Sequence, residues 1–285
     1  AVSTSTISSP NPSSTDGTTV AVMTPLISAT DLAARLGEEN LRIVDATVHL
    51  TFDADGAHVA SGRETYLAGH LPGAVFADQI TDLSDPDGEA PFAAADSARF
   101  ADAVGRLGIG DDSTVVVYDT ANGIWATRLW WQFGLEGFDD VLVLDGGYAA
   151  WTAAGLPVET GEVTTTPASF TPRRRPQRIV STHEVAAATG ESSVLLVNAL
   201  DRESFAGGHI PGSVNVPFAE LVDDAGRLRP LEELRELFAD AGALDPSVRP
   251  VTYCGGGIAA TAAAFALHSL GRDDVAVYDG SMNAW

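Results

Sequence analysis

An internal duplication restricts the fold of this chain more than any other feature, because a chain that repeats its own motifs forms units of one type. The matching pairs occur in the same order in both halves: Asp-Ala at 45–46 with Asn-Ala at 198–199, Gly-His-Leu-Pro-Gly at 69–73 with Gly-His-Ile-Pro-Gly at 208–212, Val-Val-Val-Tyr at 115–118 with Pro-Val-Thr-Tyr at 250–253, and Asp-Gly at 145–146 with Asp-Gly at 279–280. Both Asp-Gly pairs precede a tryptophan, Trp151 or Trp285. The sequence therefore predicts two related domains.

Apolar runs typical of strands alternate with runs typical of helices. In the first half, Ser28 or Thr30 can cap a helix that runs through Leu36, and a strand follows at 41–44. The runs of the second half are 194–197, 231–241, 251–253, 259–267 and 275–277, beginning and ending with a strand. Such alternation predicts an α/β fold in which each domain has a mainly parallel sheet with helices on both faces.

Composition changes along the chain suggest where the domains begin and end. We expect a flexible tail over residues 1–24, which are rich in Ser and Thr, and an N-terminal domain over 25–157. An exposed linker rich in Thr and Pro is expected over 158–178, followed by a C-terminal domain over 179–285. The tail has no basic region followed by an apolar one, so it is not a secretory signal and we expect a cytoplasmic protein.

The overall charge excludes several kinds of partner. Sixteen basic and thirty-nine acidic residues give a net charge of -23, which argues against nucleic acid and anionic membranes. No apolar run is long enough to span a bilayer. The single cysteine excludes an internal disulfide, and the six histidines show no metal-site spacing, so we expect no metal and no cofactor. We expect a monomer or a weak dimer.

The single cysteine, Cys254, lies where chemistry is most expected. It ends a predicted strand and is followed by Gly255, Gly256 and Gly257, which open a predicted helix. Unpaired N–H groups and the helix dipole at such a position favour the ionised, nucleophilic form of a thiol. The alternative is that this cysteine is a small buried apolar residue. In a parallel sheet, however, ligands bind beyond the carboxyl ends of the strands, where Cys254 lies.

Together these motifs resemble the tandem rhodanese-type sulfurtransferases over residues 25–285. The resemblance rests on the paired Gly-His-x-Pro-Gly motifs, the strand, cysteine, loop and helix of the second half, the run Arg-Leu-Trp-Trp at 128–131, and the two Asp-Gly motifs. It implies that Cys254 takes a sulfur from thiosulfate or 3-mercaptopyruvate, becomes a persulfide, and passes the sulfur to cyanide or a thiol. The backbone amides of 255–259, up to Ile258 and Ala259, would stabilise the persulfide. Asp119 replaces the cysteine in the first half, which therefore cannot form a persulfide.

Two departures from the family pattern concern the choice of donor. Thiosulfate enzymes of this family place Arg and Lys after the cysteine, and mercaptopyruvate enzymes place Gly and then Ser or Thr. Here Gly255 and Gly256 are closer to the mercaptopyruvate pattern but supply no hydroxyl. The family's donor-binding arginine is replaced by Leu200. Arg202 could substitute for it, or it could be a solvated surface charge.

The histidines and Arg128 have alternative roles. Because Gly-His-x-Pro-Gly occurs in both halves, we expect His209 to have a structural role, with its imidazole bonded to backbone. The resemblance implies proton handling by His70 across the domain cleft, and a structural role is the alternative. Arg128 matches a buried or interdomain arginine of the family, so we expect it to be structural.

Three rival functions use a similar cysteine. A cysteine phosphatase needs an arginine six residues after the cysteine, and Ala260 occupies that position. A cysteine hydrolase needs a nearby histidine, but His268 lies near the far end of the predicted helix. The remaining alternative is a non-catalytic or sulfur-relay module that binds a protein partner, which the absence of basic loop residues favours and the retained Cys254 opposes.

Overall fold

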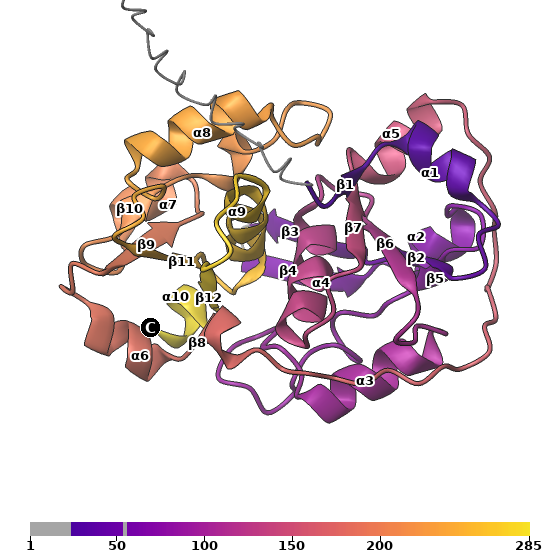
Figure 1. Ribbon diagram of the computed structural model, residues 1–285, viewed down its shortest axis with the longest axis horizontal. Coiled ribbons are helices and arrows are strands. Elements are labelled where there is room, and N and C mark those ends of the chain that lie inside the picture. The colour runs from indigo at the N-terminus through magenta and orange to yellow at the C-terminus, as the bar shows by residue number, and fades with distance from the viewer. Residues whose placement is uncertain (1–23, 54–55) are drawn as a thin grey trace, which may run out of the picture.

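The structure is a computed structural model that describes residues 24–53 and 56–285 (Figure 1). The predicted flexible tail therefore lies outside the described residues, except for residue 24. Among the described residues, no helix combines the length and the hydrophobicity that crossing a bilayer requires.

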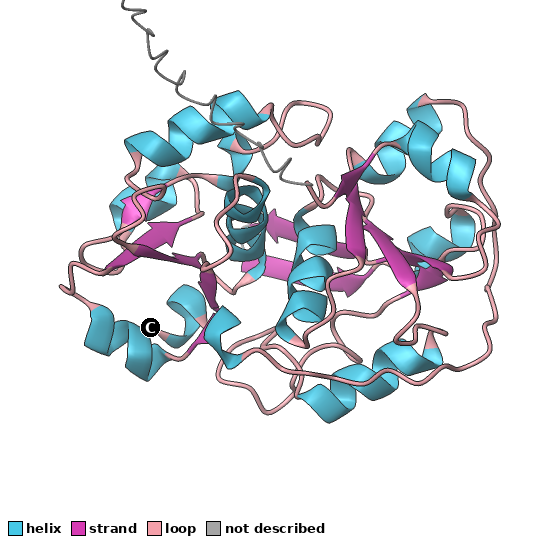
Figure 2. Cartoon of the chain, viewed as in Figure 1, coloured by secondary structure: helices cyan, strands magenta, loops and turns pink. Residues whose placement is uncertain are grey.

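Two five-stranded sheets, one in each half of the chain, form the two domains (Figures 1 and 2). The first sheet has the order β1 (Leu26–Ile27), β7 (Val141–Leu144), β6 (Thr114–Tyr118), β2 (Leu41–Asp45) and β5 (Val75–Phe76). The second sheet has the order β10 (Val214–Asn215), β9 (Val194–Asn198), β11 (Arg249–Tyr253), β12 (Ala276–Tyr278) and β8 (Ile179–Val180). All of their strand pairs are parallel, which confirms the predicted fold class.

The helices follow the strands in a similar order in both domains. The first domain contains α1 (Ala29–Arg35), α2 (Arg63–Ala68), α3 (Ser97–Arg106), α4 (Ile124–Leu135) and α5 (Gly147–Ala153). The second contains α6 (Thr182–Ala188), α7 (Arg202–Gly207), α8 (Leu231–Asp240), α9 (Ile258–Ser269) and α10 (Ser281–Ala284), with short 3-10 helices at Pro176–Arg178 and Phe218–Glu220. Of the two predicted caps, Ser28 and Thr30, the structure has Ser28, whose side chain accepts the Asp31 N–H at the start of α1.

The register of the strands confirms the duplication in space. Asp45 of β2 pairs with Tyr118 of β6, and Asn198 of β9 pairs with Tyr253 of β11. The extra residues of the first half form an antiparallel hairpin, β3 (Val48–Asp53) and β4 (Gly56–Ser61), which the sequence did not predict.

The two domains share a hydrophobic core that is centred on α4 and α9, which lie side by side (Figure 1). The Trp130 ring of α4 meets the Phe265 ring of α9 edge to face, with centroids 4.9 Å apart. Both helices are apolar on nearly every side and are almost wholly buried, as expected for helices enclosed by protein. Matching polar contacts join the domains: Asp279 accepts the Ala94 N–H at 2.7 Å, and Asp145 accepts the Leu228 N–H at 3.0 Å.

The predicted linker is mostly exposed but is attached to the first domain. Phe170 is buried in the core against Phe100 and Phe133. Arg175 forms an ion pair with Asp139 at 2.6 Å. The hydrogen bond from Arg175 lowers the pKa of Asp139 by more than burial raises it. The domain boundaries themselves remain predictions.

His268, beside Trp130 at the domain interface, is expected to make the stability of the chain depend on pH. Its ring lies 5.3 Å from the Trp130 ring, and burial lowers its pKa from 6.5 even though Asp273 pairs with it. The unfolded chain therefore binds this proton more tightly, so stability is complete above about pH 6.5 and falls as pH drops toward the folded pKa. We expect His268→Gln to reduce the loss in free energy of unfolding between about pH 7.5 and 5.5, measured by urea denaturation. An unchanged pH dependence in the variant would contradict this assignment.

Candidate active site

Cys254 lies at the carboxyl end of β11, directly before the loop that leads into α9. Its side chain is only 3 % exposed. Gly257 begins the helix with φ +81°, and a Cβ at this position would lie 2.5 Å from the Asp279 carbonyl oxygen. Only glycine fits both the left-handed backbone and this close approach. The loop is thus built around a fixed position for the sulfur.

The segment at α10 holds the backbone of the cysteine. The Cys254 N–H donates to the Ser281 hydroxyl at 3.0 Å, and the Met282 N–H donates to the Cys254 carbonyl at 3.0 Å. The Asn283 N–H donates to the Gly255 carbonyl at 2.9 Å. Ser281 adopts φ +49°, a conformation that a residue other than glycine rarely takes. These bonds leave the loop amides that follow Cys254 available for other acceptors.

Those amides belong to the three glycines. Within residues 24–53 and 56–285, the N–H groups of Gly255, Gly256 and Gly257 form no hydrogen bond. Gly255 and Gly256 are partly exposed. An anion beside Cys254 would therefore meet unpaired donors at the N-terminus of a twelve-residue helix.

The first domain shows what the same loop does when a carboxyl side chain occupies it. Asp119 follows β6 as Cys254 follows β11, and its Oδ1 accepts the N–H groups of Ala121 at 2.9 Å and Gly123 at 3.0 Å. Its Oδ2 accepts the N–H groups of Trp125 and Ala126, both at 2.9 Å. Burial raises the pKa of Asp119, and the four amide bonds act in the opposite direction.

The two loops have closely related geometry. Gly123 precedes α4 with φ +85°, as Gly257 precedes α9 with φ +81°, and both helices begin with isoleucine. The second loop is one residue shorter. The backbone of this fold therefore directs several amides at the side chain that follows the strand.

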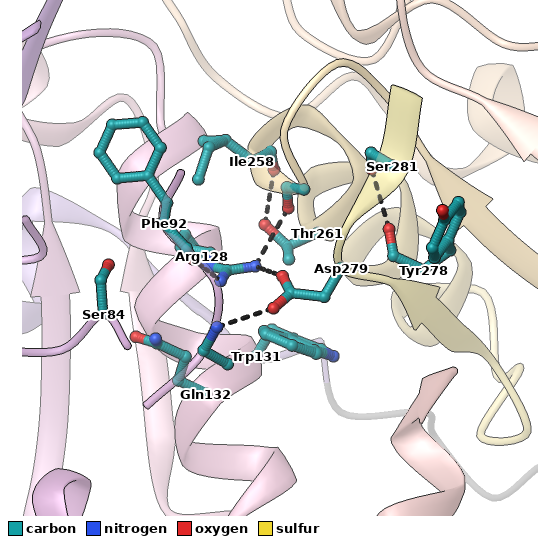
Figure 3. A network of polar contacts seen from close by, with 12 residues as sticks. Ser84, Phe92, Arg128, Trp131, Gln132, Ile258, Thr261, Tyr278, Asp279 and Ser281 are labelled. Atoms are coloured by element: carbon teal, nitrogen blue, oxygen red, sulfur yellow. Dashed lines mark hydrogen bonds and ion pairs between the residues drawn. The ribbon is translucent and has the colours of Figure 1, made fainter. Parts of the chain in front are cut away.

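Arg128 is a basic side chain beside the Cys254 loop, and its guanidinium is engaged in contacts within the protein (Figure 3). Its guanidinium donates to the Gly257 carbonyl at 3.2 Å, to Asp279 Oδ1 and to the Phe92 carbonyl. It also stacks over the Trp131 ring at 4.6 Å. The expected structural, interdomain role of Arg128 is confirmed, and no charge of Arg128 is left for a substrate.

Side chains of the first domain border the loop. Phe92 lies edge to face against Trp125, with ring centroids 5.2 Å apart, and both belong to an apolar cluster with Ile258 at the start of α9. Val48 at the base of the hairpin also belongs to this cluster, and Ile80 and Ile124 pack against it. The sequence analysis missed Phe92, Ser281 and Asn283, because their roles depend on contacts between distant segments. Only for Ser281 was there a signal, since it follows the second Asp-Gly pair as Gly147 follows the first.

The two histidines have the same structural role. Nδ1 of His70 lies 2.8 Å from the Tyr66 carbonyl, and Nδ1 of His209 lies 2.8 Å from the Phe205 carbonyl. Each imidazole also stacks on the ring of the residue whose carbonyl it faces, with centroids 4.2 Å apart for His70 and Tyr66 and 4.0 Å apart for His209 and Phe205. The backbone-bonding role is confirmed. The ring of His70 is wholly buried, and proton handling by this residue stays a prediction.

Leu200 and Arg202 have different surroundings. Leu200 is next to the loop, since its Cδ2 lies 3.9 Å from the position of a Cβ on Gly255. Arg202 pairs with Glu220 at 2.6 Å, and its side chain is 66 % exposed. The structure therefore supports the alternative of a solvated surface charge rather than donor binding by Arg202.

Comparison with known proteins agrees with this geometry. The family model of the rhodanese-like domain matches residues 28–154 and again 181–285. The probable 3-mercaptopyruvate sulfurtransferase of Pseudomonas aeruginosa is 34% identical over 275 residues, which cover 91% of this chain and 94% of the relative. The thiosulfate sulfurtransferase of Gallus gallus is 32% identical, with 89% of this chain and 88% of the relative covered.

A solved structure has the same two-domain arrangement. The 3-mercaptopyruvate sulfurtransferase SseA of Escherichia coli superimposes with a TM-score of 0.83 at 31% identity, covering 91% of this chain and 99% of SseA. Sheets, loop and cysteine thus define a protein with two rhodanese-like domains, of which only the second carries the cysteine. The chain belongs to the tandem-domain rhodanese-type sulfurtransferases.

Proposed function

We propose that this chain moves a sulfur atom from thiosulfate or 3-mercaptopyruvate to cyanide or a thiol through a persulfide of Cys254. The observation that carries the proposal is the pair of loops: the first binds a carboxylate with four amides, and the second presents unpaired amides around a cysteine. A persulfide bears its negative charge on the outer sulfur, which would lie where a carboxylate oxygen of Asp119 lies in the first domain. Amides fixed in advance stabilise such a charge as an oxyanion hole does.

The reaction divides into two displacements. The Cys254 thiolate attacks the outer sulfur of the donor, forming a sulfur–sulfur bond and releasing sulfite from thiosulfate or pyruvate from 3-mercaptopyruvate. With 3-mercaptopyruvate the thiol proton moves to the carbon that loses sulfur. The acceptor then attacks the outer sulfur and leaves as thiocyanate or a new persulfide, which restores the thiolate. Covalent catalysis of this kind replaces one difficult step by two easier ones.

The charge around the loop favours 3-mercaptopyruvate over thiosulfate. Arg128 is paired with Asp279, Leu200 occupies the side of the loop, and the net charge of the chain is -23. A dianion such as thiosulfate therefore has only backbone amides to bind it. Thiocyanate formation with each donor under the same conditions tests this order, and a higher kcat/KM for thiosulfate would contradict it.

A lysine at position 256 is expected to raise kcat/KM for thiosulfate relative to 3-mercaptopyruvate by about tenfold, the effect of one favourable charge contact near 1.4 kcal/mol. The site has room, because the nearest atom to a Cβ there is Asn283 Nδ2 at 3.0 Å, on a side chain that can rotate, and the Pro91 carbonyl oxygen lies at 3.9 Å. The matched control is Gly256→Met, which adds similar length without charge. If Gly256→Met changes the ratio as much as Gly256→Lys, the charge argument fails.

The other expectations concern the location of the protein, its oligomeric state and the roles of individual residues. Location in the cytoplasm, and a monomeric or weakly dimeric state, remain predictions. Donor binding by Arg202 and proton handling by His70 also remain predictions, since the structure shows only that Arg202 pairs with Glu220 and that Nδ1 of His70 lies 2.8 Å from the Tyr66 carbonyl.

A further inference from the structure

The buried Arg128 side chain occupies a site that groups of both domains form (Figure 3). Its guanidinium donates to Asp279 Oδ1, to the Gly257 carbonyl and to the Phe92 carbonyl. It also lies over the ring of Trp131, three residues further along α4. A carboxylate, two carbonyl oxygens and an aromatic face therefore surround this cation.

The duplication places an alanine, Ala262, at the position in α9 that Arg128 has in α4. Each is the fifth residue of a helix of 12 residues that begins with isoleucine. The aromatic residue three positions further along is Trp131 in α4 and Phe265 in α9. A cavity of about 30 Å³, the Ala262 cavity, is lined by Ala262 and Phe265. It can hold a group of a few heavy atoms, since one water molecule needs about 10–15 Å³.

Two other residues that line the Ala262 cavity match the remaining partners of Arg128. Asp145 corresponds to Asp279, since each carboxylate accepts one backbone N–H from a loop of the opposite domain. Gly226 corresponds to Phe92, since each lies two residues before the residue that donates this N–H. The two also share a left-handed backbone, with φ +71° at Gly226 and φ +63° at Phe92. The cavity is therefore the counterpart of the site that the Arg128 guanidinium fills.

The acceptors that line the Ala262 cavity have bonding capacity left. Within residues 24–53 and 56–285, Oδ2 of Asp145 forms no hydrogen bond and the Gly226 carbonyl accepts none. The Gly123 carbonyl accepts one N–H in the first turn of α4 and has a second lone pair. Burial raises the pKa of Asp145 and the charge of Arg227 acts against this, but the two side chains form no ion pair in the described part of the chain.

We propose that the Ala262 cavity binds the guanidinium group of a ligand, in the position that corresponds to the Arg128 guanidinium. Three acceptors and one ring would surround this group: the carboxylate of Asp145, the carbonyls of Gly123 and Gly226, and the ring of Phe265. A carboxylate and an aromatic face are both favourable partners of a guanidinium. Asn122, which also lines the cavity, is exposed, so the rest of the ligand can extend into solvent. The net charge of -23 attracts cations to the chain.

The test follows the amide chemical shifts of the whole chain during titration with methylguanidinium chloride, with sodium chloride at equal ionic strength as the reference. We expect saturable shifts at Gly123 and Gly226, and a Kd that Asp145→Asn raises by about tenfold or more. The matched control is Asp224→Asn, which removes the same charge from an exposed position near Gly226 and should leave Kd unchanged. Agmatine and the peptide Gly-Arg-Gly carry the same group on a small molecule and on a polypeptide, and the tighter binder identifies the kind of ligand.

A substitution in the chain tests the same cavity without a ligand. Ala262→Arg places a guanidinium on α9 as Arg128 places one on α4, so we expect it to keep or raise the urea midpoint of unfolding and to abolish methylguanidinium binding. The matched control is Ala262→Met, which adds similar length without charge and should give the lower midpoint of the two.

Three results would overturn the proposal. The first is that methylguanidinium shifts the signals of Gly123 and Gly226 no more than sodium chloride does. The second is that Asp145→Asn and Asp224→Asn weaken binding equally. The third is that Ala262→Arg is less stable than Ala262→Met, since the cavity would then be an apolar packing defect and not a cation site.

Discussion

Replacement of Cys254 by serine is expected to lower kcat/KM for sulfur transfer by at least about 1,000-fold with either donor, because a hydroxyl is a far weaker nucleophile than a thiolate. The same change should abolish the gain of about 32 Da in intact mass that donor treatment produces through persulfide formation. Cys254 is the only cysteine, so the mass gain needs no further localisation. Thiocyanate formation and mass spectrometry measure the two effects.

The serine variant should remain folded, which separates chemistry from stability. Serine is close to cysteine in size, and its hydroxyl can accept from the same loop amides that have no partner in the structure. Near-ultraviolet circular dichroism and urea denaturation check this. A folded wild-type chain that gains no mass with either donor would favour the alternative function, a non-catalytic module that binds a protein partner.

The sequence predicted the chemistry of the site better than its surroundings. Repeated motifs identified two parallel sheets, and a cysteine between a strand and three glycines identified the loop, because both signals are local in the chain. The positions of Phe92 and Ser281 depend on backbone conformations with φ +63° and +49°, which contacts from other segments impose. No periodicity in the sequence reports such contacts.

The Gly-His-x-Pro-Gly motif also shows that local contacts can be predicted from the sequence while burial cannot. Gly-His-x-Pro-Gly fixes the imidazole on the preceding aromatic residue in both domains, so its local bond was predictable. Whether the histidine is buried depends on segments distant in sequence, since Glu159 forms a bridge with His70 in the first domain. The burial of His70 is therefore a property of the folded domain and could not be predicted from the motif alone.

Replacement of Arg128 by methionine is expected to lower the free energy of unfolding by about 3–5 kcal/mol, since it leaves a buried charge without its partner. The side chains of Arg128 and Asp279 are 2% and 8% exposed, and Arg128 also holds the Gly257 carbonyl and the Phe92 carbonyl. The variant should therefore also lower kcat/KM, because the loop that ends at Gly257 loses a fixed contact. Urea denaturation and thiocyanate formation measure the two effects.

Two further variants separate the buried charge from the lost packing. Arg202→Met breaks the exposed pair with Glu220 by the same substitution, and it should cost less than about 1 kcal/mol and leave KM for both donors unchanged. Adding Asp279→Asn to Arg128→Met removes the uncompensated charge but keeps an acceptor for the Ala94 N–H, so it should restore part of the lost stability. If Arg128→Met costs no more than Arg202→Met, the ion pair does not hold the two domains around the loop. If the double variant is less stable than Arg128→Met, the loss comes from packing on Trp131 rather than from the charge.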